Sequence, residues 1–253
     1  MSVAAASPRA VNPELLLEVQ GLCGWYGAAQ VLRDVALQVR RGQVVALMGR
    51  NGAGKSTLQK ALMGLLPRRS GQIRFMGHDI SQAAPYEIAR LGLGYVPEDR
   101  RIFTDLTVQE NLAVGRLAPR RWPDGTPAPA WTPQALFTLF PNLGRMTDRL
   151  GGRMSGGEQQ MLSVARTLMG NPFLVLLDEP SEGVAPVIVE QMVHSILQLK
   201  RQGVGILLSE QNLFFAAQVA DYAYVLEKGQ VRHQSTMAGL LADAPARQAY
   251  LSL

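Results

Sequence analysis

The sequence predicts an α/β fold in which helices cover a parallel sheet on both faces. Three short apolar runs, at residues 43–48, 173–177 and 204–209, have the length and composition of buried strands. Segments with the apolar spacing of helices follow the first two runs, at residues 55–66 and 187–202. Strands that alternate with helices are typical of a parallel sheet, because each helix returns the chain to the starting edge.

The remaining segments predict smaller units around this sheet. An alternating pattern with glycines over residues 15–39 predicts short antiparallel strands, and residues 71–76 predict a strand that returns to the same small sheet. Residues 155–169 have the spacing of a further helix. The stretch 116–133 is rich in proline and cannot form a regular helix or a central strand. We interpret it as a surface connection within a mainly helical segment.

The composition narrows the class of protein. The chain has 253 residues, of which 47% are hydrophobic, enough for a substantial core. We expect one domain at residues 15–253, with a helical subdomain at about 95–168, after a flexible segment at 1–14. No apolar run approaches the ~20 residues that cross a bilayer, and the first residues do not resemble a secretory signal. The chain is therefore expected to be soluble, or held on a membrane by a partner.

The distribution of charge, cysteine and histidine argues against a nucleic-acid-binding protein, a disulfide-linked chain and a histidine metal site. The net charge of +5 comes from scattered arginines, which favours a solvated surface over a nucleic-acid interface, so no nucleic-acid partner is expected. Cys23 is the single cysteine, so the chain can form no internal disulfide. The three histidines are far apart and lack the spacing of a metal site.

Residues 49–57, GRNGAGKST, match the phosphate-binding pattern G-x-x-x-x-G-K-[ST] between a predicted strand and a predicted helix. Glycines let backbone N–H groups wrap a phosphate, and the helix adds its positive dipole end. Lys55 is expected to reach the β- and γ-phosphates of ATP, and the Ser56 hydroxyl to ligate Mg²⁺. The predicted nucleotide-binding residues of this loop are Gly49, Asn51, Gly52, Ala53, Gly54, Lys55, Ser56 and Thr57.

A second part of the same site is predicted at the end of the apolar run 173–177. Asp178 and Glu179 follow this run directly. Asp178 is expected to hold Mg²⁺ through its water shell, and Glu179 to polarise the attacking water. An ordinary polar strand end is the alternative, but the phosphate loop upstream favours a nucleoside triphosphatase.

The family is indicated by residues 154–160, MSGGEQQ, which lie just before this strand. Here the chain resembles the ATP-binding cassette (ABC) ATPases, whose signature is a Ser-Gly-Gly core at the start of a helix. The resemblance implies a P-loop fold with a RecA-like core, a small antiparallel β subdomain and a helical subdomain. It also implies that Ser155, Gly156 and Gly157 contact the γ-phosphate of ATP bound by an opposite subunit, so that the chain must dimerise to hydrolyse ATP.

Further positions follow from the same resemblance. Tyr26 occupies the place of an aromatic residue that stacks on adenine. Glu98 replaces the usual Q-loop glutamine and can serve as a carboxylate ligand of Mg²⁺. Gln211 occupies the place of the usual switch histidine, and we count it with Glu179 among the expected catalytic residues. Glu182 departs from the family pattern, which usually has an apolar residue before Gly183.

The segments VPEDRRIF, DEPSEGVAP and EQN narrow the resemblance to one ATP-binding subunit of importers for branched-chain amino acids, urea or amides. That family implies ATP and Mg²⁺ as cofactors and a second ATP-binding subunit, in a heterodimer or a homodimer. It also implies two transmembrane permease subunits and, indirectly, a periplasmic solute-binding protein. The expected location is the cytoplasmic face of the bacterial inner membrane.

Two other functions remain open. The first is a soluble ABC protein that acts on ribosomes or DNA, but such proteins usually carry two cassettes or a long coiled-coil insertion, and neither is seen here. The second is a regulatory cassette that binds ATP with little turnover. The presence of Lys55, Asp178 and Glu179 argues against it, whereas Gln211 keeps it open.

Overall fold

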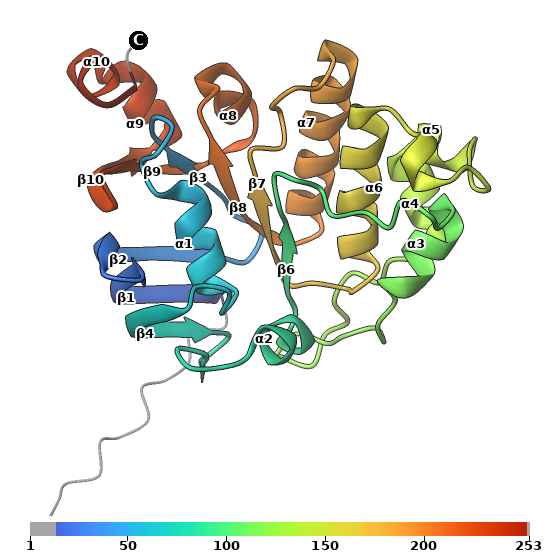
Figure 1. The fold of residues 1–253 in the computed structure, drawn as a ribbon, viewed down its shortest axis with the longest axis horizontal. Helices are drawn as coiled ribbons and strands as arrows, with labels where there is room; N and C mark the ends of the chain where they lie inside the picture. Colours follow the sequence, from blue (N-terminus) through green and yellow to red (C-terminus); the bar gives the residue numbers. More distant parts are fainter. Residues whose placement is uncertain (1–13, 252–253) are drawn as a thin grey trace, which may run out of the picture.

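The computed structural model describes residues 14–251, which form two sheets and the helices around them (Figure 1). The predicted flexible segment 1–14 lies outside the described residues except for Glu14. Among residues 14–251, no helix is both long enough and apolar enough to cross a bilayer.

The smaller sheet is antiparallel and has the order β2-β1-β4-β5. Its strands are β1 (Leu15–Tyr26), β2 (Ala29–Arg40), β4 (Arg68–Phe75) and β5 (His78–Asp79). The prediction of short strands was wrong here, because β1 and β2 are each 12 residues long. Gly21 lies inside β1 with φ 61° where the pairing register shifts, so it marks an irregularity within the strand. Gly27, at φ 57°, lies in the turn that joins β1 to β2.

The larger sheet is parallel except at one edge and has the order β10-β9-β3-β8-β7-β6. Its strands are β3 (Val44–Met48), β6 (Leu93–Val96), β7 (Leu174–Asp178), β8 (Gly205–Glu210), β9 (Tyr222–Glu227) and β10 (Gln230–Thr236). The three predicted buried strands are confirmed as β3, β7 and β8, and every residue of these strands is buried. β8 lies between β3 and β7 and is parallel to both, so the segments that follow these three strands lie side by side at the carboxyl end of the sheet.

Helices cover both faces of this sheet (Figure 1). The helices are α1 (Lys55–Leu62), α2 (Pro85–Leu91), α3 (Val108–Val114), α4 (Pro133–Leu139), α5 (Pro141–Gly144), α6 (Gly156–Leu168), α7 (Pro186–Arg201), α8 (Leu213–Val219), α9 (Met237–Ala242) and α10 (Ala244–Leu251). A 3₁₀ turn covers Gly151–Arg153. Helix α1 lies between the two sheets, where Leu58 and Leu62 share one core with Val45 and Leu176. Helices α6 and α7 bury their apolar sides against the opposite face.

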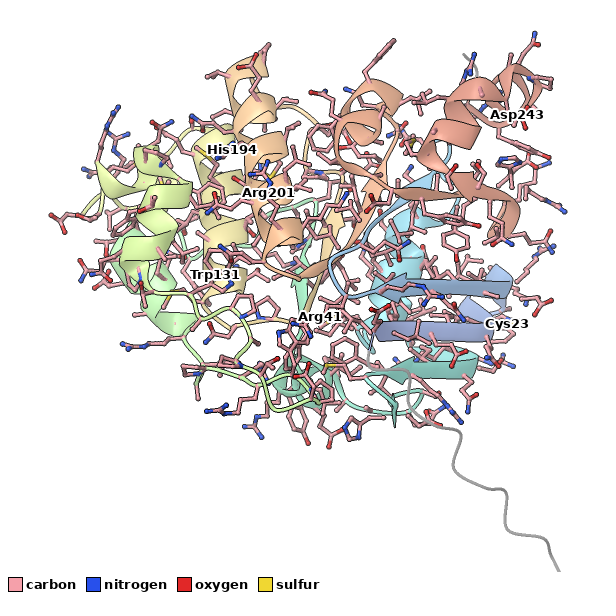
Figure 2. The ribbon with its side chains drawn as sticks, turned by 180° about the vertical axis from the view of Figure 1, so that it is seen from behind. Cys23, Arg41, Trp131, His194, Arg201 and Asp243 are labelled. Carbon is pink, nitrogen blue, oxygen red and sulfur yellow. The ribbon has the colours of Figure 1, made fainter. Side chains whose placement is uncertain are left out.

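The proline-rich stretch is more firmly attached to the domain than the interpretation as a surface connection implies. It forms no helix before α4, as predicted, but its two tryptophans are buried. The centroids of the Trp122 and Phe173 rings are 4.8 Å apart. The guanidinium carbon of Arg41 lies 4.0 Å from the centroid of the Trp122 ring. The backbone N–H of Trp131 donates to Oδ1 of Asn171 at 2.7 Å. Figure 2 labels Trp131 and Arg41 among the side chains. Burial of two large aromatic side chains therefore fixes a segment that lacks regular structure.

Candidate functional site

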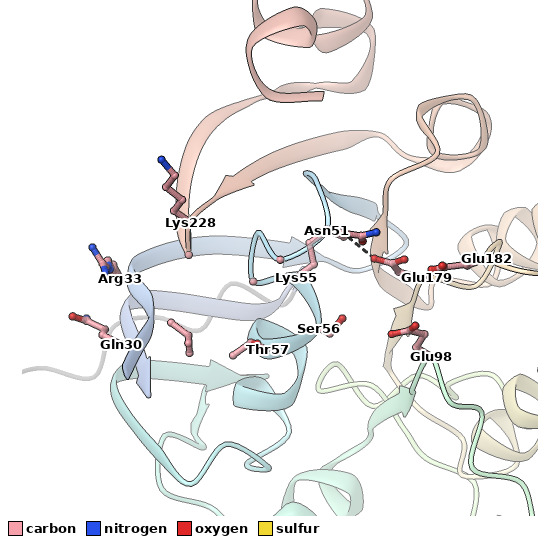
Figure 3. A pocket seen from close by; sticks show the side chains of 14 residues that line it. Gln30, Arg33, Asn51, Lys55, Ser56, Thr57, Glu98, Glu179, Glu182 and Lys228 are labelled. Carbon is pink, nitrogen blue, oxygen red and sulfur yellow. Dashed lines mark ion pairs between the residues drawn. The ribbon is translucent and has the colours of Figure 1, made fainter. Parts of the chain in front are cut away.

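A cavity of about 710 Å³ opens at the carboxyl ends of β3 and β7 (Figure 3). It is lined by residues from the phosphate loop and the start of α1, from β2 of the smaller sheet and from the segments after β6, β7 and β9. These residues are Gln30, Val31, Arg33, Asn51, Gly52, Gly54, Lys55, Ser56, Thr57, Glu98, Glu179, Glu182, Lys228 and Gly229. Arg33 and Lys228 lie at one end in Figure 3, and the three glutamates lie at the other. The cavity is large enough for a small organic ligand.

The loop between β3 and α1 has the geometry of an anion-binding nest. Gly54 precedes α1 at φ 107° and makes no side-chain cap, so the first N–H groups of the helix are left for a ligand. Gly49 has φ 146°, and a Cβ there would lie 2.4 Å from the Leu226 carbonyl oxygen. The Lys55 ammonium is buried and donates to the carbonyl oxygens of Gly49 at 2.9 Å and Arg50 at 3.3 Å. The sequence motif therefore forms the predicted loop.

Two side chains hold the Glu179 carboxylate at the floor of the cavity. The Lys55 ammonium lies 3.0 Å from Oε1 of Glu179, and both side chains are more than 90% buried. The Gln211 side-chain amide donates to Oε2 at 2.9 Å. Burial alone would raise the pKa of Glu179, but the hydrogen bonds that it accepts, together with the Lys55 charge, bring that pKa below its usual value. Glu179 also has φ 44°, an uncommon backbone conformation for a residue with a side chain.

The Asp178 side chain belongs to a residue that is 1% exposed, and its carboxylate accepts hydrogen bonds from hydroxyl groups on three different elements. Oδ1 accepts from Ser56 on α1 at 2.9 Å and from Ser209 on β8 at 2.5 Å. Oδ2 accepts from the Tyr95 hydroxyl on β6 at 3.3 Å. Burial, followed by the neighbouring Asp178 charge, raises the pKa of Tyr95 well above its usual value, so this phenol remains a donor.

Further carboxylates surround Glu179 and make this end of the cavity acidic. The hydrogen bond to Glu179, burial and the charges of Glu179, Glu98 and Glu210 together raise the pKa of Glu182 to about 7. Burial raises the pKa of Glu210, whose carboxylate accepts the backbone N–H groups of Ser181, Gln211 and Asn212 at 3.1 Å each. Glu210 therefore ties the segment after β7 to the segment after β8.

The signature residues lie outside this cavity, at the start of α6. Ser155 caps the helix in a reciprocal capping box with Glu158, in which the Ser155 N–H donates to Oε2 of Glu158 at 2.7 Å. The Arg100 guanidinium lies against Gly156, where a Cβ would be 2.9 Å from its Nη1 atom. A Cβ at Gly157 would lie 2.7 Å from the Ile188 side chain, so only glycine fits there without movement. The helix predicted from residue 155 is thus confirmed as α6.

Tyr26 ends β1 with 44% of its surface exposed and is not among the residues that line the cavity.

The sequence did not predict the lining residues that come from β2 and from the turn between β9 and β10. Lys228 and Gly229 form that turn with φ 50° and 75°, the conformation of a two-residue hairpin loop. The dipeptide Lys-Gly signals a turn, but nothing in the sequence places it beside the phosphate loop. A Cβ at Gly229 would lie 1.9 Å from the Val31 carbonyl oxygen, so the turn approaches β2 closely.

The fold, the phosphate loop and the acidic strand end define a P-loop ATPase of the cassette type. The ABC transporter family model matches residues 32–182, which is more than half of the chain. The chain therefore belongs to the ABC transporter ATP-binding family, whose domain binds nucleotide and hydrolyses ATP, and the predicted ATPase class is confirmed.

Relatives of this chain span nearly its whole length. It is 43% identical, over 93% of its length and 99% of the other, to the high-affinity branched-chain amino acid transport ATP-binding protein BraG of Pseudomonas aeruginosa. It is 33% identical to the lipopolysaccharide export system ATP-binding protein LptB of Escherichia coli, over 93% and 96% of the two chains. A solved ATP-binding subunit of an ABC transporter has 31% identity and a TM-score of 0.76, over 94% and 96% of the two chains. An ABC transporter cassette in its ADP conformation has 27% identity and a TM-score of 0.76, over 92% and 97%.

Proposed function

We propose that this chain is the ATP-hydrolysing subunit of a membrane importer for branched-chain amino acids or for related small solutes such as urea or amides. The observation that carries this proposal is the 43% identity to BraG over 99% of that protein. The identity to LptB, a component of an export system, is ten points lower over a similar span. A role in lipopolysaccharide export is therefore the weaker candidate.

In the proposed site, ATP lies in the cavity with its phosphates in the loop of residues 49–57. Lys55 leaves Glu179 and reaches the β- and γ-phosphates, because a phosphate oxygen competes with the carboxylate for the ammonium. Glu179 is then free to polarise the attacking water, and Gln211 keeps one of its oxygens in place at 2.9 Å. Tyr26, which does not line the cavity, is the proposed partner of adenine.

The residues present fit Mg²⁺. The proposed ligands are Ser56, Glu98 and Asp178, all of which offer oxygen, the donor that Mg²⁺ prefers. Among residues 14–251 there is no group of three or more His, Cys, Asp or Glu side chains placed to hold a metal on its own. Mg²⁺ usually retains waters and shares nucleotide phosphates with one or two carboxylates. When bound, the ion neutralises phosphate charge.

The proposed assembly pairs this chain with a second ATP-binding subunit and two permease subunits at the cytoplasmic face of the bacterial inner membrane. The Ser155-Gly156-Gly157 segment faces the nucleotide of the opposite subunit, which agrees with its position outside the cavity of its own chain. A periplasmic solute-binding protein delivers the solute to the permease. No nucleic acid takes part.

The proposed permease contact lies in residues 99–115. A groove of about 430 Å³ next to this segment is lined mainly by apolar atoms, including those of Phe103 and Val114. Phe103 and Val114 are 47% and 58% exposed, so they add apolar surface beside the groove. Arg101 and Arg166 line the same groove and add positive charge. An amphipathic permease segment with an acidic residue has the matching chemistry.

Reconstitution tests this function. The chain is purified with its partner ATP-binding subunit and permeases and placed in proteoliposomes with the binding protein. We expect permease-dependent ATP hydrolysis together with uptake of labelled leucine or urea. Hydrolysis without uptake of any tested solute would contradict the importer proposal. Nucleotide binding with no turnover in the complete complex would favour a regulatory cassette, a role that Gln211 keeps open. Activity that depends on ribosomes or DNA would favour the soluble alternative.

A further inference from the structure

Asp178 has hydrogen bonds beyond those that its proposed role as a metal ligand requires. Three hydroxyls donate to its two oxygens, and only Ser56 belongs to the phosphate loop. The other two come from Ser209 and Tyr95, on the strands that flank β7 on either side. Neither residue lines the nucleotide cavity, although Tyr95 lines a smaller cavity together with Glu98 and Asp178. The contact that both hydroxyls share is their hydrogen bond to Asp178.

Ser209 lies directly opposite Asp178 in the parallel pairing of β7 with β8. Its side chain is fully buried and follows the apolar residues Leu207 and Leu208. A buried hydroxyl is costly unless it is hydrogen-bonded, and this one donates to Oδ1 of Asp178. It also accepts from the Glu179 N–H at 3.3 Å, and that N–H lies 3.0 Å from the Ser209 carbonyl oxygen. Ser209 thus contacts both acidic residues of the strand end.

Tyr95 holds the other oxygen from the opposite side. Its hydroxyl donates to Oδ2 at 3.3 Å, and a phenol retains its proton at physiological pH. The backbone of Tyr95 is in register with Leu176 on β7, two residues before Asp178. Because strand pairing fixes the positions of both donors, rotation of the carboxylate about its Cβ–Cγ bond would break one or both hydrogen bonds.

We propose that Ser209 and Tyr95 are positioning residues that hold the Asp178 carboxylate in the orientation in which it receives the hydrated Mg²⁺ of the bound nucleotide. This inference rests on the proposed nucleotide site. Ser56 cannot supply the same restraint, because its hydroxyl is itself a proposed ligand of the ion and would be engaged by the ion in the nucleotide complex. Outer partners of this kind commonly change metal affinity by about 10- to 100-fold when they are removed.

The test measures nucleotide affinity with and without the metal, so it requires no turnover. A non-hydrolysable ATP analogue is titrated into the purified full chain by calorimetry, once in EDTA and once in excess Mg²⁺. The variants are Ser209→Ala and Tyr95→Phe, each of which removes one hydroxyl. Ser195→Ala and Tyr224→Phe are the matched controls. Ser195 is a buried serine on α7 that donates to the Gln191 carbonyl oxygen, and the Tyr224 hydroxyl accepts from the Gln38 N–H.

We expect Ser209→Ala to leave the affinity in EDTA unchanged and to reduce the gain in affinity from Mg²⁺ by about tenfold. Tyr95→Phe should act in the same direction but less, because its hydrogen bond is longer. Ser209→Thr, which retains a hydroxyl, should recover most of the gain.

Three results separate the possibilities. If the wild-type chain shows no gain from Mg²⁺, the proposed metal site itself is wrong, and the inference falls with it. If the wild-type gain is present and both variants keep it, the positioning role is overturned. Equal losses in EDTA and in Mg²⁺, with both controls unaffected, would also overturn it, because they would indicate a purely structural role for these hydroxyls.

Discussion

The Lys55 ammonium lies 3.0 Å from Oε1 of Glu179, so the cation proposed to bind phosphate and the carboxylate proposed to activate water are paired with each other. Both side chains are more than 90% buried, and Gln211 holds the second oxygen of Glu179. This arrangement keeps Glu179 ionised without a ligand, since two donors stabilise its charge. In the proposed nucleotide complex this pair must separate. The Lys55 ammonium already contacts two backbone carbonyls and Glu179, and it has too few donors to keep all three contacts and also bind two phosphates.

Loss of Lys55 should destabilise the nucleotide-free chain. Lys55→Ala removes the cation beside a buried carboxylate that then keeps its hydrogen bonds to Gln211 and Glu182. We expect this loss to lower the free energy of unfolding by about 1–3 kcal/mol at pH 7. The folded-state pKa of Glu179 lies below 4.5, so its stabilising charge is present above that pH and is lost as the pH falls through the folded value. Urea denaturation should therefore show a smaller difference in free energy of unfolding between the wild-type chain and Lys55→Ala at pH 4 than at pH 7. Lys60→Ala, on the same helix, is the control, and an effect of Lys60→Ala as large as that of Lys55→Ala would contradict the argument.

Glu179→Gln should reduce transport less in this chain than the same change in the partner ATP-binding subunit. The reason is Gln211, which donates a neutral hydrogen bond to Glu179 where a histidine could carry positive charge. We expect the site formed by Lys55, Glu179 and Gln211 to be the slower of the two. Uptake by the reconstituted complex, with one subunit changed at a time, measures this difference. Equal losses from the two changes would refute the idea.

A companion variant isolates the side chain at position 211. Gln211→Ala should lower hydrolysis at this site by about tenfold, the effect of one lost hydrogen bond to a charged group. Gln211→His should equal or exceed the wild-type rate. Hydrolysis is measured in a complex whose other site is inactivated, so that only this site contributes. If Gln211→Ala turns over at the wild-type rate, its contact with Glu179 has no role in catalysis.

Glu182 should make stability depend on pH near neutrality. Its folded-state pKa of about 7 lies above its usual value of 4.5, so between these values the folded chain binds a proton that the unfolded chain has released. The contribution of this group to stability should accordingly fall as the pH rises from 5 to 8. Glu182→Gln removes that fall, and its melting temperature should exceed that of the wild type by more at pH 8 than at pH 5. The shift is expected to be small because Glu182 is exposed to solvent.

Melting curves across this pH range provide the measurement. Glu190→Gln, which changes an exposed residue on α7, is the matched control and should run parallel to the wild type. Parallel curves for Glu182→Gln and the wild type would show that the cluster of Glu179, Glu98 and Glu210 does not hold a proton on Glu182.

Ser155→Ala should separate nucleotide binding from hydrolysis. Because Ser155 lies outside the cavity of its own chain, the isolated variant should bind a fluorescent ATP analogue as tightly as the wild type. In the assembled complex, hydrolysis at the opposite site should fall. The lost helix cap costs about 1 kcal/mol by itself. Thr236→Ala controls for this cost, since the Thr236 hydroxyl caps α9 by accepting the Gly239 N–H. Impaired nucleotide binding by the isolated Ser155→Ala chain, with the Thr236→Ala chain unaffected, would argue against the split site.

The chemistry of the phosphate site could be predicted from the sequence because it depends on contiguous residues. A phosphate-binding loop of this type requires glycines and a lysine at set spacing before a helix, so GRNGAGKST alone is enough to predict it. The same is true of Asp178 and Glu179, which directly follow a buried apolar strand. Helix α6 could likewise be predicted from its own residues, and its proposed signature role depends on Ser155 and the two glycines after it. Each of these features depends on neighbours along the chain.

The tertiary structure alone decided which distant residues complete that site. Strand order in a parallel sheet depends on how each crossover is routed, and no local pattern records it. The order places β8 between β3 and β7, and so brings Ser209 to Asp178 and Gln211 to Glu179. The long β1 and β2, in place of the short strands predicted, followed from pairing that tolerates the irregularity at Gly21. The sequence by itself therefore determined which groups form the loop that is proposed to bind phosphate, and the packing of the sheet determined which distant groups contact Asp178 and Glu179.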